Sequence, residues 1–320
     1  MRIVFFGTPE WAVPSLEALS GASHGITHVI TQPAGRRGRG GAVSPSPIAL
    51  AAAERGHAVI EPQTIRDEAF AARIGSERAD LLVVVAYGRI LPQRLLDLPR
   101  HGALNVHFSL LPRYRGAAPV QWTIAAGDEA TGVTTMRMVR ELDAGPIYLQ
   151  EQVAIEPGEH APELGGRLAV VGARLLLETV AGVASGALSP REQDASQASF
   201  APSLSAAQGQ VDWSQRAEVI ARRVRAFDPW PGQSARSRRG TLRLLEAQAH
   251  GYAAPPENRA SEAPVGTTLG LDGDSLLVAC AEGTVLAIER LQPEARRRMT
   301  GAEAIRGRHL EVGERLDGGP

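Results

Sequence analysis

The stretch LLVVV at residues 81–85 decides the class of fold. Five apolar residues in a row leave no polar face, which is typical of a strand buried on both sides of a parallel sheet. Similar apolar runs recur in the first half of the chain, at 2–6, 26–31, 58–60, 80–86 and 103–107. Helical patterns lie between them, at 9–19, 47–55 and 66–74. The alternation predicts an α/β domain with a doubly wound, Rossmann-like sheet.

The pattern changes in the second half of the chain. Two further strand-like runs, at 131–138 and 147–155, precede a long helical stretch at 163–183. Residues 182–210 are rich in Ala, Ser, Gln, Pro and Gly and lack periodicity, as linkers do. A helical stretch at 214–227 is followed by short strands, at 242–247, 266–271, 275–279 and 285–289, which predict a small β-barrel. We therefore expect an N-terminal domain at 1–188, a linker at 189–210 and a C-terminal domain at 211–320.

The composition limits the classes of protein that this chain can be. Of its 320 residues, 43% are hydrophobic and 22% are charged, which excludes wholesale disorder. The longest apolar run, 81–87, is far shorter than a membrane span, and residues 1–6 are predicted to form a strand rather than a signal peptide. One cysteine excludes an internal disulfide and a multi-cysteine metal site, and the expected location is cytoplasmic.

The basic residues are unevenly distributed, although the net charge is only −1. All 34 are arginine, so no lysine is available as a nucleophile or as the phosphate ligand of a P-loop. Arginines are concentrated at 216–243 and at 296–298, and a third cluster consists of Arg36, Arg37 and Arg39. One such cluster can be a solvated surface, but three in a balanced chain favour an anionic partner.

A nucleotide-binding oxidoreductase is one alternative for a fold of this kind. Gly7-Thr8-Pro9 follows the first predicted strand and would place free N–H groups at a helix N-terminus, which suits an anion. However, neither the G-x-G-x-x-G spacing nor a G-x-x-x-x-G-K loop is present in the sequence. The sequence therefore disfavours this alternative.

The strongest chemical signal is Asn105-Val106-His107. Residues two apart on a strand share a face, so the Asn105 amide and the His107 imidazole are expected to point together. A hydrogen-bond donor beside an imidazole can stabilise the oxyanion formed in acyl transfer. Asp143, which follows a later predicted strand, supplies a carboxylate that could orient the imidazole. No Ser, Cys or Lys stands in a nucleophile motif, which favours direct attack by the substrate's own nucleophile.

Three segments around these residues resemble the folate-dependent formyltransferases: AYGRILP (86–92), NVHFSLLPRYRGAAPVQW (105–122) and GVTTMRMVRELDAGPIY (132–148). Four others look like the branch of that family that acts on methionyl-tRNA: FFGTPEWAVPSLEAL (5–19), the TQP, GRG and PSP motifs within 31–47, RAFDPWPG (225–232) and LQPEARRRMTGAEAIRG (291–307). The resemblance spans nearly the whole chain. It implies a Rossmann-like catalytic domain, a linker and a C-terminal barrel resembling an OB-fold.

The resemblance also implies an activity and a set of site residues. The formyl group of 10-formyltetrahydrofolate would be transferred to the α-amino group of initiator methionyl-tRNA, with Asn105, His107 and Asp143 as catalytic residues. The expected folate-binding residues are Tyr87, Gly88, Arg89, Ile90, Leu91, Pro92, Ser109, Leu110, Leu111 and Pro112. The expected tRNA-binding residues are Arg36, Arg37, Arg39, Arg222, Arg223 and Arg225. We expect a monomer that uses no metal and binds no membrane.

Other functions share part of this pattern. A formyltransferase acting on a nucleotide sugar or on glycinamide ribonucleotide would have the catalytic residues but lack the motifs at 225–232 and 291–307. A formyltetrahydrofolate hydrolase would differ in using water as the nucleophile. A catalytically silent RNA-binding module would not need Asn105, His107 and Asp143.

The sequence departs from the family pattern at Phe108, at Ser203, where a lysine is common, and in the loop at 36–41, which lacks the lysines usual there. Phe108 stands where the family usually has a small residue, and strand alternation predicts that its ring points away from Asn105 and His107. It is expected to pack under the loop at 109–112.

Overall fold

The computed structural model describes residues 1–22, 24–37, 42–251 and 263–317. It divides into two compact units whose chain segments interleave along the sequence. Unit 1 consists of Met1–Pro119, Ala130–Ala154 and Leu164–Pro202. Unit 2 consists of Val120–Glu129, Ile155–Glu163 and Ser203–Pro320. The chain therefore passes between the units several times before it ends in unit 2.

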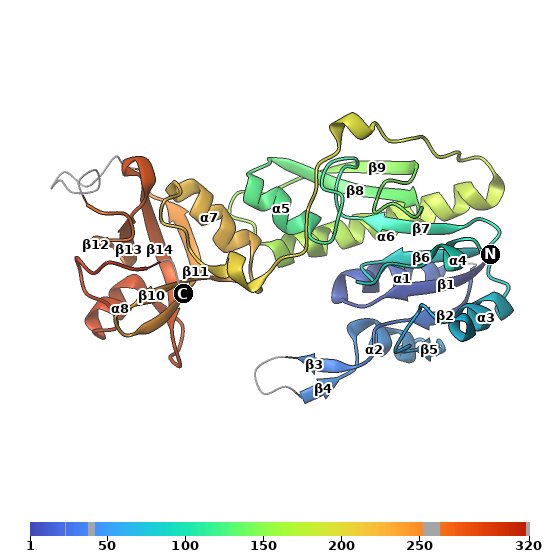
Figure 1. The fold of residues 1–320 in the computed structure, drawn as a ribbon, viewed down its shortest axis with the longest axis horizontal. Coiled ribbons are helices and arrows are strands. Elements are labelled where there is room, and N and C mark those ends of the chain that lie inside the picture. Colours follow the sequence, from blue (N-terminus) through green and yellow to red (C-terminus); the bar gives the residue numbers. More distant parts are fainter. Residues whose placement is uncertain (23, 38–41, 252–262, 318–320) are drawn as a thin grey trace. The chain divides into compact units, whose positions relative to one another are not determined.

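Unit 1 is built on a seven-stranded sheet with the strand order β5-β2-β1-β6-β7-β8-β9 (Figure 1). The strands are β1 (Arg2–Gly7), β2 (Gly25–Ile30), β5 (Val59–Ile60), β6 (Leu81–Val85), β7 (Ala103–His107), β8 (Ala130–Arg137) and β9 (Ile147–Ala154). The first five in spatial order pair in parallel. Strands β8 and β9 are antiparallel. The predicted α/β fold is confirmed, with two antiparallel strands extending the parallel sheet.

Helices cover both faces of this sheet. On one face, α3 (Glu68–Ser76) and α4 (Gln93–Leu96) pack on β1 and β6 through Phe70, Ile74, Leu95, Leu96, Val4, Phe6, Leu82 and Val84. On the other face, α6 (Ala161–Ser185) lies against β7 and β8. A Cβ atom on Gly172 of α6 would sit 2.9 Å from Val106 and 3.5 Å from Val133. Only a glycine allows the helix to come this close to the sheet.

Local signals account for the helices that the sequence predicts. Ser46 precedes α2 (Pro47–Glu54), and its hydroxyl accepts a hydrogen bond from the Ala49 N–H at 3.0 Å. Asp67 caps α3 by accepting from the Phe70 N–H at 2.7 Å. The helix predicted at 9–19 is observed as a short 3-10 helix, Glu10–Ala12, followed by α1 (Val13–Gly21).

Helix α6 is long and apolar enough to cross a membrane by length and composition alone, with a mean hydropathy of 1.6 over its most apolar window. Half of that window is buried inside the structure. A core helix of a folded domain passes the same test, and α6 forms part of the packing of unit 1.

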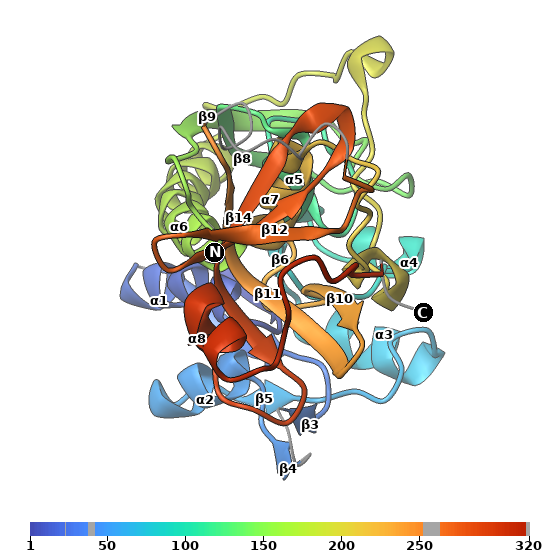
Figure 2. The same cartoon turned by 90° about the vertical axis from the view of Figure 1, so that its left-hand side faces the viewer.

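Unit 2 contains an antiparallel sheet with the order β10-β11-β14-β13-β12, to which β15 adds by pairing with β14. Figure 2 labels β10, β11, β14 and β12 of this sheet. Its strands are β10 (Gln233–Ser237), β11 (Gly240–Ala249), β12 (Thr268–Asp272), β13 (Ser275–Ala279), β14 (Val285–Pro293) and β15 (Met299–Thr300). Helix α7 (Ala217–Ala226) packs on β11 and β14, and α8 (Gly301–Arg306) packs on β13 and β14. Helix α5 (Pro119–Ala126), which belongs to this unit from Val120 on, packs the ring of Trp122 edge-on against Phe227.

The chain near the C-terminus links the two edges of this antiparallel sheet. Arg236 of β10 forms an isolated antiparallel bridge with Asp317, and Thr267, next to β12, forms one with Arg315. Sheet edges with free N–H and C=O groups are prone to pair with other chains. Here the segment from Arg315 to Asp317 occupies part of both edges.

Several short elements were not predicted from the sequence. They are β3 (Gly35–Arg37), β4 (Ala42–Ser44), α4, α5, β10, β15 and α8. Most span six residues or fewer, and β10 reads QSARS, with no large apolar residue. Their pairing depends on partners elsewhere in the chain, which a local pattern does not show.

Candidate active site

Strand β7 carries two of the predicted catalytic residues on one face. Asn105 pairs in register with Val84 of β6 and Met136 of β8, and His107 is the last residue of the strand. The odd-numbered residues share the face covered by α3 and α4, because Ala103 packs in the same cluster as Leu82. The structure thus presents the Asn105 amide and the His107 ring on the same side of the sheet.

The ring of His107 has an oxygen acceptor near each nitrogen. Its Nε2 lies 2.9 Å from the carbonyl oxygen of Tyr114, and its Nδ1 lies 3.7 Å from Oδ2 of Asp143. A carbonyl oxygen only accepts hydrogen bonds, so Nε2 carries the proton and donates it. The distance from Nδ1 to the carboxylate is too long for a hydrogen bond. Nδ1 is therefore the nitrogen that remains available to a substrate, beside a negative charge.

Asp143 is buried and held by the loop that follows β7. Its Oδ2 accepts a hydrogen bond from the Gly116 N–H at 2.8 Å. Its own backbone has a φ of 51°, a left-handed conformation that non-glycine residues adopt uncommonly. Gly116 has a φ of 127°, and a Cβ atom there would lie 2.5 Å from the carbonyl oxygen of Ala201. Gly116 is thus required for the backbone approach that lets its N–H reach Asp143.

The segment after His107, which was predicted to bind folate, is tied together by internal hydrogen bonds. The Ser109 hydroxyl is fully buried and donates to the carbonyl of Arg113 at 2.7 Å. The Thr134 hydroxyl donates to the Ser109 carbonyl at 2.7 Å and accepts from the Leu111 N–H at 3.2 Å. Ser109 and Leu111 are therefore buried supports of the loop, whereas Leu110 and Pro112 are partly exposed.

The other predicted folate segment, 87–92, follows β6 and likewise contains both buried and exposed side chains. Tyr87 and Leu91 are buried, and burial raises the pKa of the Tyr87 phenol. Ile90 is 65% exposed, which makes it an apolar side chain open to a ligand. Gly88 has a φ of 78°, and a Cβ atom there would lie 2.6 Å from the Gln32 amide.

The polar groups of this second segment bond within unit 1. The Tyr87 carbonyl accepts from Gln32 Nε2 at 2.8 Å. Arg89 donates to the carbonyl oxygens of Pro62 and Gln63 at 3.2 and 3.0 Å. Pro92, partly exposed, directly precedes α4.

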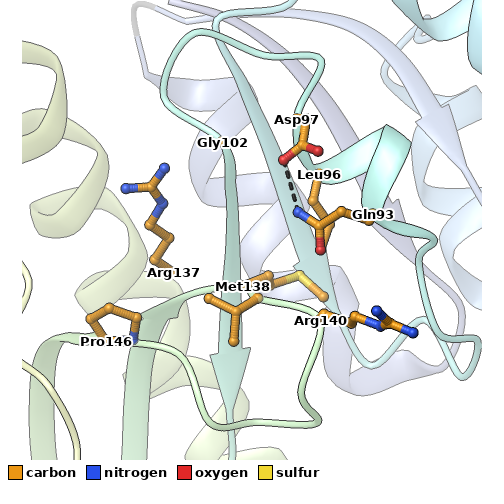
Figure 3. Close-up of a pocket in the computed structure, with 9 residues that line it drawn as sticks. Gln93, Leu96, Asp97, Gly102, Arg137, Met138, Arg140 and Pro146 are labelled. Atoms are coloured by element: carbon orange, nitrogen blue, oxygen red, sulfur yellow. Dashed lines mark hydrogen bonds between the residues drawn. The ribbon is translucent and has the colours of Figure 1, made fainter.

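A cavity of about 210 Å³ opens next to these segments (Figure 3). It is lined by Gln93, Leu96, Asp97, Gly102, Arg137, Met138, Val139, Arg140 and Pro146. Its wall combines apolar side chains with two guanidinium groups and with the Gln93 amide, which donates to Asp97 at 2.8 Å. None of these residues was predicted as a site residue. In the sequence they lie in two stretches, one that follows Pro92 and one on either side of Asp143.

Phe108 lies on the opposite side of β7 from the catalytic pair. Its ring is buried and packs edge-on against Trp11, with ring centroids 6.2 Å apart. Gly172 of α6 is also close, because a Cβ atom there would lie 3.4 Å from the Phe108 ring. The ring thus packs between Trp11 and α6, rather than filling the face that carries Asn105 and His107.

In unit 2, α7 carries three arginines that were predicted to bind tRNA. Arg222, Arg223 and Arg225 are all partly exposed, and no salt bridge links them to a carboxylate in the described part of the chain. Nε of Arg222 is buried without a hydrogen-bond partner. Burial and, to a smaller extent, the charge of Arg222 lower the pKa of the Arg225 guanidinium.

The remaining predicted residues give less information. Arg36 and Arg37 lie in β3, which pairs with β4, and Arg39 lies outside the described residues. Within the ranges that the structure describes, no group of three or more His, Cys, Asp or Glu side chains is arranged to hold a metal ion.

Comparison with known proteins identifies the family of this chain. Residues 1–180 match the formyl transferase family model, and residues 203–309 match the model of the formyl transferase C-terminal domain. The chain is 42% identical over 319 residues to the methionyl-tRNA formyltransferase of Solibacter usitatus, covering 100% of this chain and 99% of that protein. It is 42% identical over 320 residues to that of Acidobacterium capsulatum, covering 99% of each.

Among solved structures, an N-formyltransferase from Helicobacter canadensis, in complex with folinic acid and dTDP-3-aminofucose, has the same fold. The TM-score is 0.63 at 14% identity, over 90% of this chain and 98% of that one. The two curated relatives align along nearly their whole length, and this chain matches both family models, one in each half. The chain belongs to the methionyl-tRNA formyltransferase family.

Proposed function

We propose that this chain transfers the formyl group of 10-formyltetrahydrofolate to the α-amino group of initiator methionyl-tRNA. The observation that carries the proposal is the position of His107, whose ring is anchored on the Tyr114 carbonyl and faces Asp143. Asn105 lies two residues earlier on the same face of β7. These are the groups that acyl transfer to an amine requires, in a chain whose close relatives are named for this reaction.

In the proposed reaction the neutral amine attacks the formyl carbon directly. A bond forms between the amine nitrogen and that carbon, the carbonyl oxygen becomes an oxyanion, and the bond from the carbon to N10 of the folate then breaks. The proton lost by the amine ends on the released folate nitrogen. The Asn105 amide and Nδ1–H of His107 donate to the oxyanion, and Asp143 stabilises the positive charge on the ring.

The cavity beside α4 is the proposed site for part of the folate. Ring systems bind in clefts that combine apolar walls with a few polar groups, and this cavity has both. Val139 and Arg140 of its wall belong to the same loop as Asp143, so a ligand seated there would lie close in the chain to the catalytic carboxylate. The exposed side chain of Ile90 extends the apolar surface available to the donor. The expected donor-binding segments, 87–92 and 109–112, flank these elements in sequence.

For the tRNA, α7 supplies three arginines that form no salt bridge with a carboxylate in the described part of the chain. Phosphate contacts supply most of the affinity for nucleic acid, and they depend on local rather than total charge. Arg222, Arg223 and Arg225 are the proposed contacts in unit 2, with Arg36, Arg37 and Arg39 as the proposed second group. The proposal includes a monomeric, cytoplasmic enzyme without a metal or a membrane partner, with a catalytic domain at 1–188, a linker at 189–210 and a tRNA-binding domain at 211–320.

The direct test offers the purified protein 10-formyltetrahydrofolate together with charged initiator tRNA or charged elongator tRNA. We expect formyl-methionine on the initiator tRNA at a rate far above that on the elongator. Formylation of a nucleotide-sugar amine or of glycinamide ribonucleotide, without formylation of tRNA, would identify a different member of the superfamily. Release of formate without any amine acceptor would identify a hydrolase.

A further inference from the structure

The segment after α6 has the composition of a linker, yet its first part lies along the catalytic loop of unit 1. The Arg115 N–H donates to the carbonyl of Ser199 at 2.8 Å, and the Ala201 N–H donates back to the carbonyl of Arg115 at 2.8 Å. The Ser199 hydroxyl accepts from the Tyr114 N–H at 2.9 Å. Tyr114 is the residue whose carbonyl anchors His107, so this segment supports the catalytic loop directly.

Within this segment, Gln193 reaches both loops that hold the catalytic residues. Its Nε2 donates to the carbonyl oxygens of Asp143 and Gly145, at 2.8 and 2.7 Å. Its Oε1 accepts from Nε and Nη2 of Arg115, at 3.1 and 2.7 Å. All four hydrogen-bonding positions of one amide are thus directed at two loops that are not adjacent in sequence.

These contacts act at a residue whose backbone conformation is uncommon. Asp143 has a positive φ, which persists only where the surrounding structure determines it. The bonds from Gln193 hold the carbonyl of that same residue. On the other side, Arg115 is nine-tenths buried, and the amide oxygen satisfies two of its guanidinium donors. Arg115 directly precedes Gly116, whose N–H binds the Asp143 carboxylate.

We infer that Gln193 is a positioning residue for formyl transfer: it fixes the Asp143 carboxylate opposite Nδ1 of His107 by joining the two loops. This inference rests on the proposed function, because it concerns the same reaction. Gln193 does not touch the reacting atoms. Its effect reaches the reaction through the placement of Asp143.

The test compares three variants of the full chain. Gln193→Met keeps the size of the side chain and removes all four hydrogen bonds. Gln193→Glu keeps the acceptor for Arg115 and removes the two donors to the Asp143 loop. Gln197→Met is the control, because the exposed Gln197 amide donates to the nearby Asp194 and bonds to neither catalytic loop among the described residues. A displacement of about 1 Å in catalytic geometry costs on the order of 100-fold.

We expect Gln193→Met and Gln193→Glu each to lower kcat by about 10- to 100-fold, while KM for both substrates changes less than about threefold. The control should retain the parent kcat. Wild-type kcat in Gln193→Glu would overturn the inference, because the bonds to the Asp143 loop would then be dispensable. Thermal unfolding of each variant measures how much of the loss comes from folding.

A double mutant separates positioning from general support. If Gln193 acts through Asp143, then Gln193→Met should cost less than about twofold when added to Asp143→Asn, under single-turnover conditions. A full additional loss in that background would show a role independent of Asp143 and would overturn the inference. The parent protein distinguishes this result from failure of the proposed function: if it does not formylate charged initiator tRNA, the function itself is wrong.

Discussion

The surroundings of His107 in unit 1 and helix α7 in unit 2 use polar side chains in opposite ways. Around His107, the nearby polar groups have defined partners: the Tyr114 carbonyl accepts from His107, the Tyr114 N–H donates to the Ser199 hydroxyl, and the Gly116 N–H donates to Asp143. On α7, the three arginines at 222, 223 and 225 form no salt bridge in the described structure, whereas Arg216, at the start of the helix, forms salt bridges with both Glu218 and Glu282. A reaction needs fixed geometry, whereas binding to phosphates needs charge that the protein itself does not neutralise.

The largest effect is expected for substitutions of the catalytic residues beside His107. Asn105→Ala and Asp143→Asn should each lower turnover by about 10²- to 10³-fold. The first removes a donor to the developing oxyanion, and the second removes the charge that stabilises the His107 ring, which donates to the same oxygen. Folate binding should survive, since neither side chain lines the cavity. Single-turnover formyl transfer and equilibrium binding of the folate measure the two quantities. Near-parental turnover in both variants would show that Asn105 and Asp143 are not catalytic residues.

The next largest effect is expected for the arginines of α7. Replacing Arg223 and Arg225 with Gln should weaken tRNA binding about tenfold at moderate salt and reduce the slope of log K against log salt by about 1 for each phosphate that is no longer bound. A titration of tRNA binding over several salt concentrations measures both. Arg216→Gln is the matched control, because Glu218 and Glu282 already neutralise that charge. Equal slopes in the variant and the parent would contradict the proposed docking surface.

A smaller effect is expected in the cavity beside the catalytic loop. Val139→Ser removes an apolar contact with the donor and should raise KM for 10-formyltetrahydrofolate about five- to tenfold, with kcat nearly unchanged. Leu98→Ser is the control, because Leu98 is similarly exposed, at 43% against 38%, but does not line the cavity. If both substitutions raise KM equally, the cavity is not the folate site.

The smallest effects test how rigidly the catalytic strand is supported from its other face. Gly165→Ala would place a Cβ atom 2.2 Å from the Trp11 indole, which packs on Phe108, and should lower the free energy of unfolding by about 1–3 kcal/mol. Gly166→Ala meets no atom within 4 Å and should raise it by about 0.5–1 kcal/mol. Denaturant unfolding measures both. The same sign for the two variants would show that packing on Trp11 does not decide the outcome.

Much of the sheet in unit 1 could be predicted from the sequence. β7 was predicted at its observed bounds, as was β13, because apolar runs bounded by turn residues are strong signals. The antiparallel direction of β8 and β9 was not predicted, since pairing direction depends on the path of the connecting loop. The strand β10 was missed because its buried side chains, Gln233, Ala235 and Ser237, are small or polar.

Part of the candidate site could also be predicted from the sequence. Asn105 and His107 share a strand, so their spacing alone places them together. Asp143 comes from a distant loop. Its position after a predicted strand suggested a carboxylate that could orient the imidazole, and the resemblance to the family then implied that it is catalytic. The cavity and the contacts of Gln193 involve segments far apart in the sequence, and no periodicity reports such contacts. Ser109 and Leu111 were predicted to bind folate from their motif, which does not reveal that both side chains are buried.

Because segments of the two units alternate along the sequence, a truncation between them separates residues that pack together. Helix α5 lies inside the first half of the sequence, but its Trp122 packs on Phe227 and Gly127 at its end lies against the Arg222 side chain, where a Cβ atom would come within 2.9 Å. A fragment that stops at residue 188 would keep Trp122 and Gly127 and lose both partners. One cut therefore does not yield two self-sufficient pieces. Exchanging C-terminal halves between relatives requires that 120–129 and 155–163 be exchanged with them.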